Sequence, residues 1–300
     1  MDNTSIQLQT VLYNNDVEML LRSLHSISKA IDIYNIDKDK KIYVEVHYGD
    51  ASLKQILSEE TISSLQYQFN NMRIQYQYFG FNSGTARGHN ILATDCSLDY
   101  ILLMNPDVLF CPQFFNEILF PFKKYKKDVG IVEGRQTPIE HPKVYNLVTG
   151  ETSWSSGACS LITTDLFHEV NGYDETFFMY CDDVDLSWRV RLLNRKVIYQ
   201  PRAVVFHSKG LSREGGWIPT EAEIYYSTEA ALFMARKWFD NKQLVALLKQ
   251  FSLSGNKSLE KAYKKFIELQ KSDKLPDPVS RSKEVAMFVN GNYALHRFKL

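Results

Sequence analysis

The sequence lacks the features of a disulfide-stabilised or a membrane-spanning protein. Its four cysteines among 300 residues are widely separated and form no Cys-x-x-Cys pair, a pattern that suits reduced thiols better than a disulfide framework or a zinc site. No uninterrupted apolar run approaches the roughly 18 residues of a transmembrane helix. The first residues contain neither a basic segment nor a long apolar segment, so we expect no signal peptide. These absences predict a cytoplasmic protein.

An excess of charge of either sign is also absent. Lys and Arg together number 35, as do Asp and Glu, so the net charge is zero, and the overall charge does not indicate a nucleic-acid partner. The chain is 44% hydrophobic and 13% aromatic, which is ample for a packed core and argues against disorder. Its length fits one large domain, or a domain with an appendage.

The first half of the chain alternates between strand and helix patterns. Strand patterns cover residues 6–13, 41–47 and 74–79. Apolar residues at helical spacing follow the first of them, after a polar cluster suited to a helix N-cap that ends at Asp16. Strands and helices joined by short turns predict a parallel sheet built from β-α-β units.

Residues 100–104 are five consecutive apolar residues and predict a short strand in the middle of this sheet, buried on both faces. Pro106 has no N–H for a strand ladder, so the strand must end or leave the sheet there. Asp107 therefore follows the carboxyl end of a central strand, where open α/β sheets form their sites. A turn aspartate without a catalytic role is the alternative.

The second half is less regular. We expect helices at 114–125, 166–170 and 183–193, strands at 129–133, 154–162, 197–199 and 203–206, and a loop at 136–152. The composition shifts near Gly215-Gly216, and the chain beyond has helical patterns. We therefore predict a catalytic domain over residues 1–215 and a C-terminal helical extension over residues 216–300.

Three carboxylates fall within four positions at Asp182, Asp183 and Asp185. A solvated helix N-terminus would hold them without any function. Alternatively, one removes a proton from a hydroxyl group, a task for which like-charged neighbours raise its pKa. With Asp107 and with His207, which follows a predicted strand, the cluster offers oxygen and nitrogen ligands for a divalent ion bound to a diphosphate.

Residues 82–90 form a glycine-bearing turn that opens a helix. The turn has neither a Walker lysine pattern nor the Gly-x-Gly-x-x-Gly spacing of a dinucleotide site. Arg87 and His89 are candidates to meet a phosphate at this helix N-terminus.

Several of these segments, in this order, resemble the family-two glycosyltransferases, and within that family they are most similar to bacterial rhamnosyltransferases of polysaccharide assembly. The similarity spans roughly residues 6 to 210. It is carried by Tyr13-Asn14, by residues 49–52, 82–84, 88–90 and 103–107, by the run from Val170 to Leu186, and by Arg189.

The resemblance implies a GT-A fold, an α/β fold with a mostly parallel central sheet flanked by helices. It also implies a nucleotide-diphosphate sugar donor, a divalent cation (Mg²⁺ or Mn²⁺) and inversion at the anomeric carbon. The expected donor is dTDP-rhamnose, with UDP-galactose, UDP-galactofuranose or UDP-glucose as alternatives. The expected acceptor is a hydroxyl of a growing cell-surface polysaccharide or a lipid-linked saccharide. A non-catalytic homologue that binds nucleotide sugars is the rival interpretation.

The resemblance also assigns roles by position. Asp183 matches the catalytic base, and Asp182, where glutamate is usual, is the next candidate. Asp107 and His207 match metal ligands, while Asn105 replaces the first aspartate of the family's Asp-x-Asp motif. The residues expected to contact substrate are Tyr13 and Asp50 for base and ribose, and Asn82, Arg87, Asn105, Trp154 and Asp182.

The segment 257–271 is basic on one side and apolar on the other. It predicts either a helix that packs on the catalytic domain with a solvated lysine face, or a surface helix that contacts the anionic inner face of a membrane.

Overall fold

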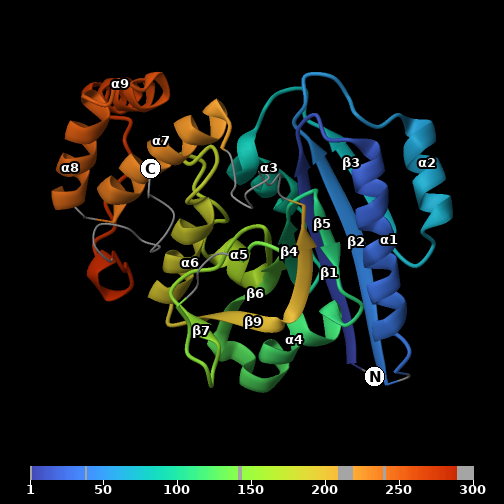
Figure 1. Ribbon diagram of the computed structural model, residues 1–300. Coiled ribbons are helices and arrows are strands. Elements are labelled where there is room, and N and C mark those ends of the chain that lie inside the picture. Colours follow the sequence, from blue (N-terminus) through green and yellow to red (C-terminus); the bar gives the residue numbers. More distant parts are fainter. Residues whose placement is uncertain (1, 38, 141–143, 209–218, 239–240, 289–300) are drawn as a thin grey trace.

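The computed structural model describes residues 2–37, 39–140, 144–208, 219–238 and 241–288. Within these residues a central sheet is flanked by helices, and three further helices form a separate group beside it (Figure 1). The predicted boundary at 215/216 lies outside the described residues.

The first half of the chain forms the predicted β-α-β units. Strand β1 pairs in parallel with β2 on one side and β4 on the other, and β2 pairs in parallel with β3. The side chain of Asp16 accepts a hydrogen bond from the backbone N–H of Glu18, which confirms the predicted N-cap of α1. The elements are β1 (Asp2–Leu12), α1 (Val17–Tyr34), β2 (Lys40–Asp50), α2 (Glu59–Gln68), β3 (Arg73–Tyr78), α3 (Gly84–Ala93) and β4 (Tyr100–Met104).

The second half completes the sheet with strands of mixed direction. Its strands are β5 (Val108–Phe110), β6 (Val129–Thr137), β7 (Glu151–Thr152), β8 (Cys159–Thr163) and β9 (Lys196–His207). Its helices are α4 (Phe114–Tyr125), α5 (Thr164–Glu169), α6 (Asp182–Leu192), α7 (Glu221–Lys237), α8 (Asn241–Ser252) and α9 (Lys257–Lys271), with 3₁₀ turns η1 (Lys126–Asp128) and η2 (Ser282–Glu284). The strand order in the described chain is β3-β2-β1-β4-β8-β6-β9-β5, and β7 pairs with β9.

Strand β4 is buried on both faces, as predicted. Leu102 contributes to the hydrophobic cluster under α1 and α4, whereas Leu103 contributes to the cluster under α3, α5 and α6. The direction of one neighbouring strand differs from the prediction of a parallel sheet. Strand β4 pairs in parallel with β1 but antiparallel with β8. The sheet is therefore mixed at its centre.

Two predicted strands proved to be one. Residues 197–199 and 203–206 both belong to β9, because the register shift near Gly134 and Arg135 in β6 lets the pairing resume after Pro201. Strand β6 also extends to Thr137, four residues beyond its predicted end. The predicted loop at 136–152 ends in the short strand β7.

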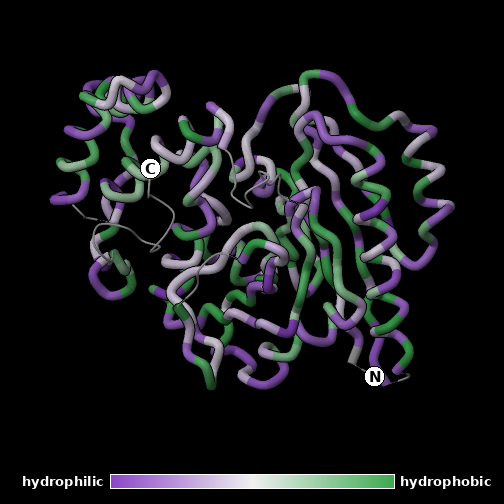
Figure 2. The backbone as a smooth tube through the Cα atoms, in the orientation of Figure 1, coloured by the Kyte–Doolittle hydropathy of each residue, from purple (hydrophilic) through white to green (hydrophobic). Residues whose placement is uncertain are grey.

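The C-terminal helices pack on α6. Val184 and Trp188 of α6 share a hydrophobic cluster with residues of α7, α8 and α9. Leu259, Ala262 and Phe266 of the basic helix α9 are buried in this arrangement, so its apolar face is engaged by the protein. The burial of this face agrees with the packing interpretation. Figure 2 shows hydrophobic residues along the central strands and within the C-terminal helices. No helix in the described part of the chain is long and apolar enough to cross a membrane.

Candidate functional site

The predicted metal ligands Asp107 and His207 lie side by side. Strand β5 pairs antiparallel with β9 so that Val108 is opposite His207, and this register brings the side chain of Asp107 to the histidine. Nε2 of His207 lies 3.2 Å from Oδ1 of Asp107 and 3.3 Å from Nδ2 of Asn105. The two residues on either side of Pro106 therefore meet the end of β9.

The chemistry of this pair fits a divalent cation. Nδ1 of His207 lies 2.8 Å from Oε1 of Gln136, so an N–H at Nδ1 leaves the Nε2 lone pair toward the Asp107 carboxylate. A carboxylate oxygen and an imidazole nitrogen that face each other are suitable ligands for one ion. The described residues contain no group of three or more His, Cys, Asp or Glu side chains able to hold a metal. Phosphate oxygens of a ligand would have to complete the coordination shell of an ion held by Asp107 and His207. The expectation that carboxylates of the 182–185 cluster belong to the same metal site is wrong.

The predicted base, Asp183, lies in the first turn of α6 and is buried. Its Oδ2 accepts a hydrogen bond of 2.9 Å from the N–H of Gly157. The next residue, Ala158, accepts a hydrogen bond of 3.0 Å from the N–H of Asn105. Two adjacent loop residues therefore connect Asp183 to the end of β4, where Asp107 follows.

The neighbouring Asp182 contacts the glycine-bearing turn. Its Oδ2 accepts a hydrogen bond of 2.8 Å from the hydroxyl of Thr85, and the N–H of Thr85 donates to the carbonyl of Phe178 at 3.0 Å. The start of α3 and the start of α6 are thus held together. Thr85 and Asp182 are 97 positions apart in the sequence, and no local pattern predicts that they meet.

The acidic cluster is not a solvated helix terminus. Asp182, Asp183 and Asp185 are only 8%, 7% and 0% exposed, because α6 lies between two hydrophobic clusters. The chain enters the helix through left-handed backbone conformations at Tyr180 and Cys181, with φ of 69° and 59°. Such conformations are uncommon for residues with side chains and occur often at functional sites.

Asp50 and Tyr13, the predicted base and ribose contacts, differ in accessibility. Tyr13 follows β1 and is about half exposed. Asp50 at the end of β2 is fully buried. Its carboxylate accepts hydrogen bonds from the N–H groups of Ser52 at 2.9 Å and Ile56 at 2.8 Å, and from the hydroxyl of Tyr76. Asp50 therefore organises the loop after β2, and direct contact with a nucleotide stays a prediction.

The predicted residues of the glycine-bearing turn differ in their exposure and in their contacts. Asn82 accepts a hydrogen bond of 3.2 Å from the N–H of Gly84. Arg87 is exposed, with its guanidinium 4.7 Å from the centre of the Phe81 ring and 3.8 Å from Glu175. The suggestion that His89 meets a phosphate is wrong: its side chain is buried, and burial lowers its pKa to about 3. A neutral, buried imidazole offers no positive charge to an anion.

Trp154 was expected to contact substrate, but its indole is buried in the cluster formed by α6 and the C-terminal helices. Because large apolar side chains gain most from burial, a tryptophan next to an apolar helix face packs there. This placement does not support a contact with substrate.

Gly84 is required for the contact between the two segments. It has φ of +66°, and a Cβ atom added there would lie 2.2 Å from the carbonyl oxygen of Phe178. We expect Gly84→Ala to destabilise the protein by more than about 1 kcal/mol, through both the conformation and the clash. Chemical denaturation measures this loss.

The matched control is Gly255→Ala, because Gly255 also has a positive φ, of +69°, but nothing lies within 4 Å of its added Cβ. Equal losses for the two variants would show that the contact with Phe178 is unimportant.

The sequence matches no protein-family model. It is 42% identical over 59 residues to the N-acetylglucosaminyl-diphospho-decaprenol L-rhamnosyltransferase of Mycobacterium tuberculosis, covering 20% of this chain and 19% of that protein. The match thus spans about a fifth of the length of this relative. The rhamnosyltransferase WbbL of Escherichia coli is 24% identical over 217 residues, covering 60% of this chain and 78% of that protein.

Solved structures align over more of the chain. GalNAc-T7 with UDP, GalNAc and Mn²⁺ aligns with a TM-score of 0.64 at 14% identity, covering 94% of this chain and 57% of that one. The mannosyltransferase PcManGT of Pyrobaculum calidifontis with GDP-Man and Mn²⁺ gives 0.58 at 12% identity, covering 89% and 75%. TarS of S. aureus gives 0.54 at 13% identity, covering 84% and 73%. The chain has a GT-A fold and resembles rhamnosyltransferases.

Proposed function

We propose that this protein is an inverting glycosyltransferase that moves a sugar from a nucleotide-diphosphate donor to a hydroxyl group of a saccharide acceptor. The observation that carries the proposal is the connection of Asp183, through Gly157 and Ala158, to the end of β4 and hence to Asp107 and His207. A buried carboxylate and a suitable metal pair lie at the edge of the sheet where this fold class forms its sites.

In the proposed reaction, Asp183 accepts the proton of the acceptor hydroxyl as its oxygen attacks the anomeric carbon. The bond from that carbon to the diphosphate breaks on the opposite face, which inverts its configuration. The Gly157 N–H holds one carboxylate oxygen, and this fixes the direction in which the base points. A bound divalent cation, held by Asp107 and His207, would neutralise charge on the leaving diphosphate.

The proposed donor, cation and acceptor rest on similarity to known proteins. The preferred donor is dTDP-rhamnose, because the two curated relatives described above carry rhamnosyltransferase names. Mg²⁺ or Mn²⁺ is the proposed cation, in line with the Mn²⁺ in two of the similar structures. The proposed acceptor is a lipid-linked or polysaccharide hydroxyl.

Thermal stabilisation by a panel of nucleotide sugars, with Mn²⁺ and with a chelator, tests the proposal. We expect dTDP-rhamnose with Mn²⁺ to raise the midpoint of unfolding most, since a ligand that binds the native state stabilises it. A larger shift with UDP-galactose, UDP-galactofuranose or UDP-glucose would reassign the donor. Stabilisation without any turnover would favour a non-catalytic binding protein.

Asp107→Ala should weaken binding of the donor nucleotide only when metal is present. The carboxylate is one of two protein ligands in the proposed shell, and its loss leaves His207 alone. Calorimetry of dTDP with Mn²⁺ should show at least a tenfold weaker affinity, about 1.4 kcal/mol, and little change with chelator. The exposed carboxylate of Asp165 on α5 provides the control, Asp165→Ala. Equal affinity of Asp107→Ala and wild type with metal would remove Asp107 from the metal site.

A further inference from the structure

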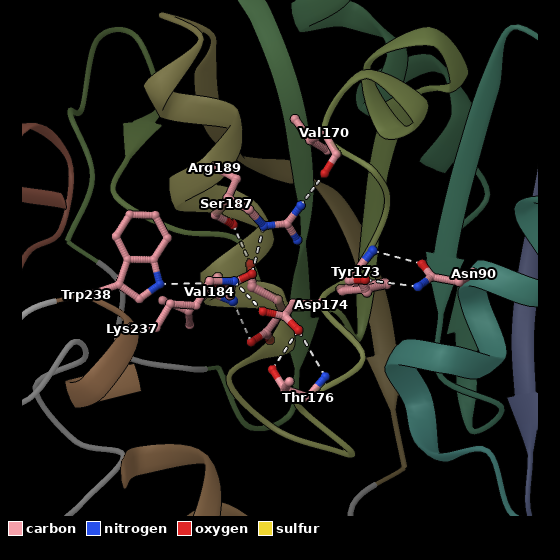
Figure 3. A network of polar contacts seen from close by, with 12 residues as sticks. Asn90, Val170, Tyr173, Asp174, Thr176, Val184, Ser187, Arg189, Lys237 and Trp238 are labelled. Atoms are coloured by element: carbon pink, nitrogen blue, oxygen red, sulfur yellow. Dashed lines mark hydrogen bonds and ion pairs between the residues drawn. The ribbon is translucent and has the colours of Figure 1, made fainter. Parts of the chain in front are cut away.

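Lys237, the last residue of α7, joins two carboxylates that come from different segments. Its Nζ lies 2.5 Å from Oδ2 of Asp174 and 2.7 Å from Oδ1 of Asp185, and its side chain is only 8% exposed (Figure 3). Asp174 precedes the acidic cluster, and Asp185 lies within α6. A residue of the C-terminal extension thus binds both sides of the Asp182-Asp183 pair.

Both carboxylate oxygens of Asp185 are paired, whereas Nη2 of Arg189 is buried without a hydrogen-bond partner among the described residues. Trp238 donates its indole N–H to Oδ1 at 2.9 Å, and Arg189 contacts Oδ2 at 2.8 Å. Arg189 also donates to the carbonyl of Val170 at 2.5 Å. The buried Asp185 and the partly buried Asp174 therefore face two cations. Lys237 and Trp238 join the end of α7 to α6 and to the loop before it, and Arg189 joins α6 to Val170. Ion pairs and hydrogen bonds of this kind rigidify the elements that they connect.

Helix α7 also contacts the segment between Asp174 and Asp185. The Tyr226 ring of α7 stacks on Phe178 with centroids 4.5 Å apart, and Tyr180 donates its hydroxyl hydrogen to Glu223 at 3.1 Å. This segment, which α7 contacts, contains Tyr180 and Cys181, whose backbone conformations are left-handed. Left-handed conformations of such residues persist only where the surrounding structure holds them.

We propose that Lys237 is a positioning residue for the transfer reaction: by bridging Asp174 and Asp185, it fixes the turn that presents Asp183 to the acceptor hydroxyl. This inference rests on the proposed function. It also makes α7 part of the catalytic unit, although the sequence predicts it to belong to an extension.

The test compares Lys237→Met with Lys237→Met/Asp174→Asn. The single variant leaves the partly buried carboxylate of Asp174 without its cation, whereas the double variant removes that charge but does not restore the bridge. We expect the single variant to lower kcat about a hundredfold, the scale of a misplacement of roughly 1 Å, with the donor KM within about twofold. The double variant should regain thermal stability while kcat stays low.

A control separates positioning from general destabilisation. Phe266→Leu removes packing from α9 within the same hydrophobic cluster but touches none of the ion pairs, so kcat should remain normal. Recovery of kcat together with stability in the double variant would overturn the proposal, because Lys237 would then serve stability alone.

Hydrogen exchange supplies a readout that needs no turnover. In Lys237→Met the backbone amides of Gly157 and of residues 182–184 should exchange faster, while those of β1 to β3 are unchanged. Unchanged exchange at Gly157 and 182–184 would overturn the proposal. If the wild type turns over no nucleotide sugar, the proposed function fails, and the exchange experiment still decides whether Lys237 holds the turn.

Discussion

Replacing Asp183 by asparagine should lower kcat by at least a hundredfold while donor affinity stays within about twofold of wild type. The amide keeps the size of the side chain but cannot accept the proton of the acceptor hydroxyl, and general-base catalysis contributes about 10² to 10⁴ in rate. Steady-state kinetics and calorimetry of the donor measure the two quantities separately.

Asp182→Asn is the matched comparison, because Asp182 is adjacent and equally buried but accepts its hydrogen bond from Thr85 rather than from Gly157. We expect a smaller loss of rate for this variant. If Asp183→Asn keeps more than about a hundredth of the wild-type rate, the base has been misassigned, and a larger loss in Asp182→Asn would transfer the role to that residue.

The largest loss of stability should come from Asp185→Asn. Asp185 is fully buried and its carboxylate contacts Lys237, Arg189 and Trp238. Removing one partner of a buried ion pair leaves uncompensated charge and typically costs about 3–5 kcal/mol. Urea denaturation of the full chain measures this loss.

The exposed pair of Arg281 and Glu284 provides the control, since its atoms lie 2.5 Å apart but both side chains are about half exposed. Glu284→Gln should leave the unfolding midpoint nearly unchanged, as surface pairs contribute little. A similarly small effect of Asp185→Asn would mean that the network does not stabilise the fold.

The position of Asp107 after a buried strand could be predicted from the sequence because its signals are local. An apolar run that ends at Pro106 defines both the buried strand β4 and the position of Asp107 after it. The register of β5 with β9 then brings His207 to Asp107. That register follows from no local pattern, and the resemblance to known enzymes was needed to pair the two residues.

Other features could not be predicted because they depend on tertiary packing. The acidic run at 182–185 has the composition of an exposed helix start, yet the C-terminal helices cover it. Lys237 lies in a helix with many charged residues, and nothing in its sequence neighbourhood distinguishes it from a solvated lysine. Trp154 and His89 are chemically suited to ligands, and only their burial assigns them to the core.

Hydrolysis of dTDP-rhamnose to dTDP and free rhamnose, with water in place of the acceptor hydroxyl, tests the central claim most directly when it is followed over time with Mn²⁺ or with a chelator. We expect release by the wild type in the presence of the metal, much slower release with chelator, and loss of release in Asp183→Asn although the donor still binds. Equal release by wild type and Asp183→Asn, or neither binding nor release with any nucleotide sugar of the panel, would contradict it.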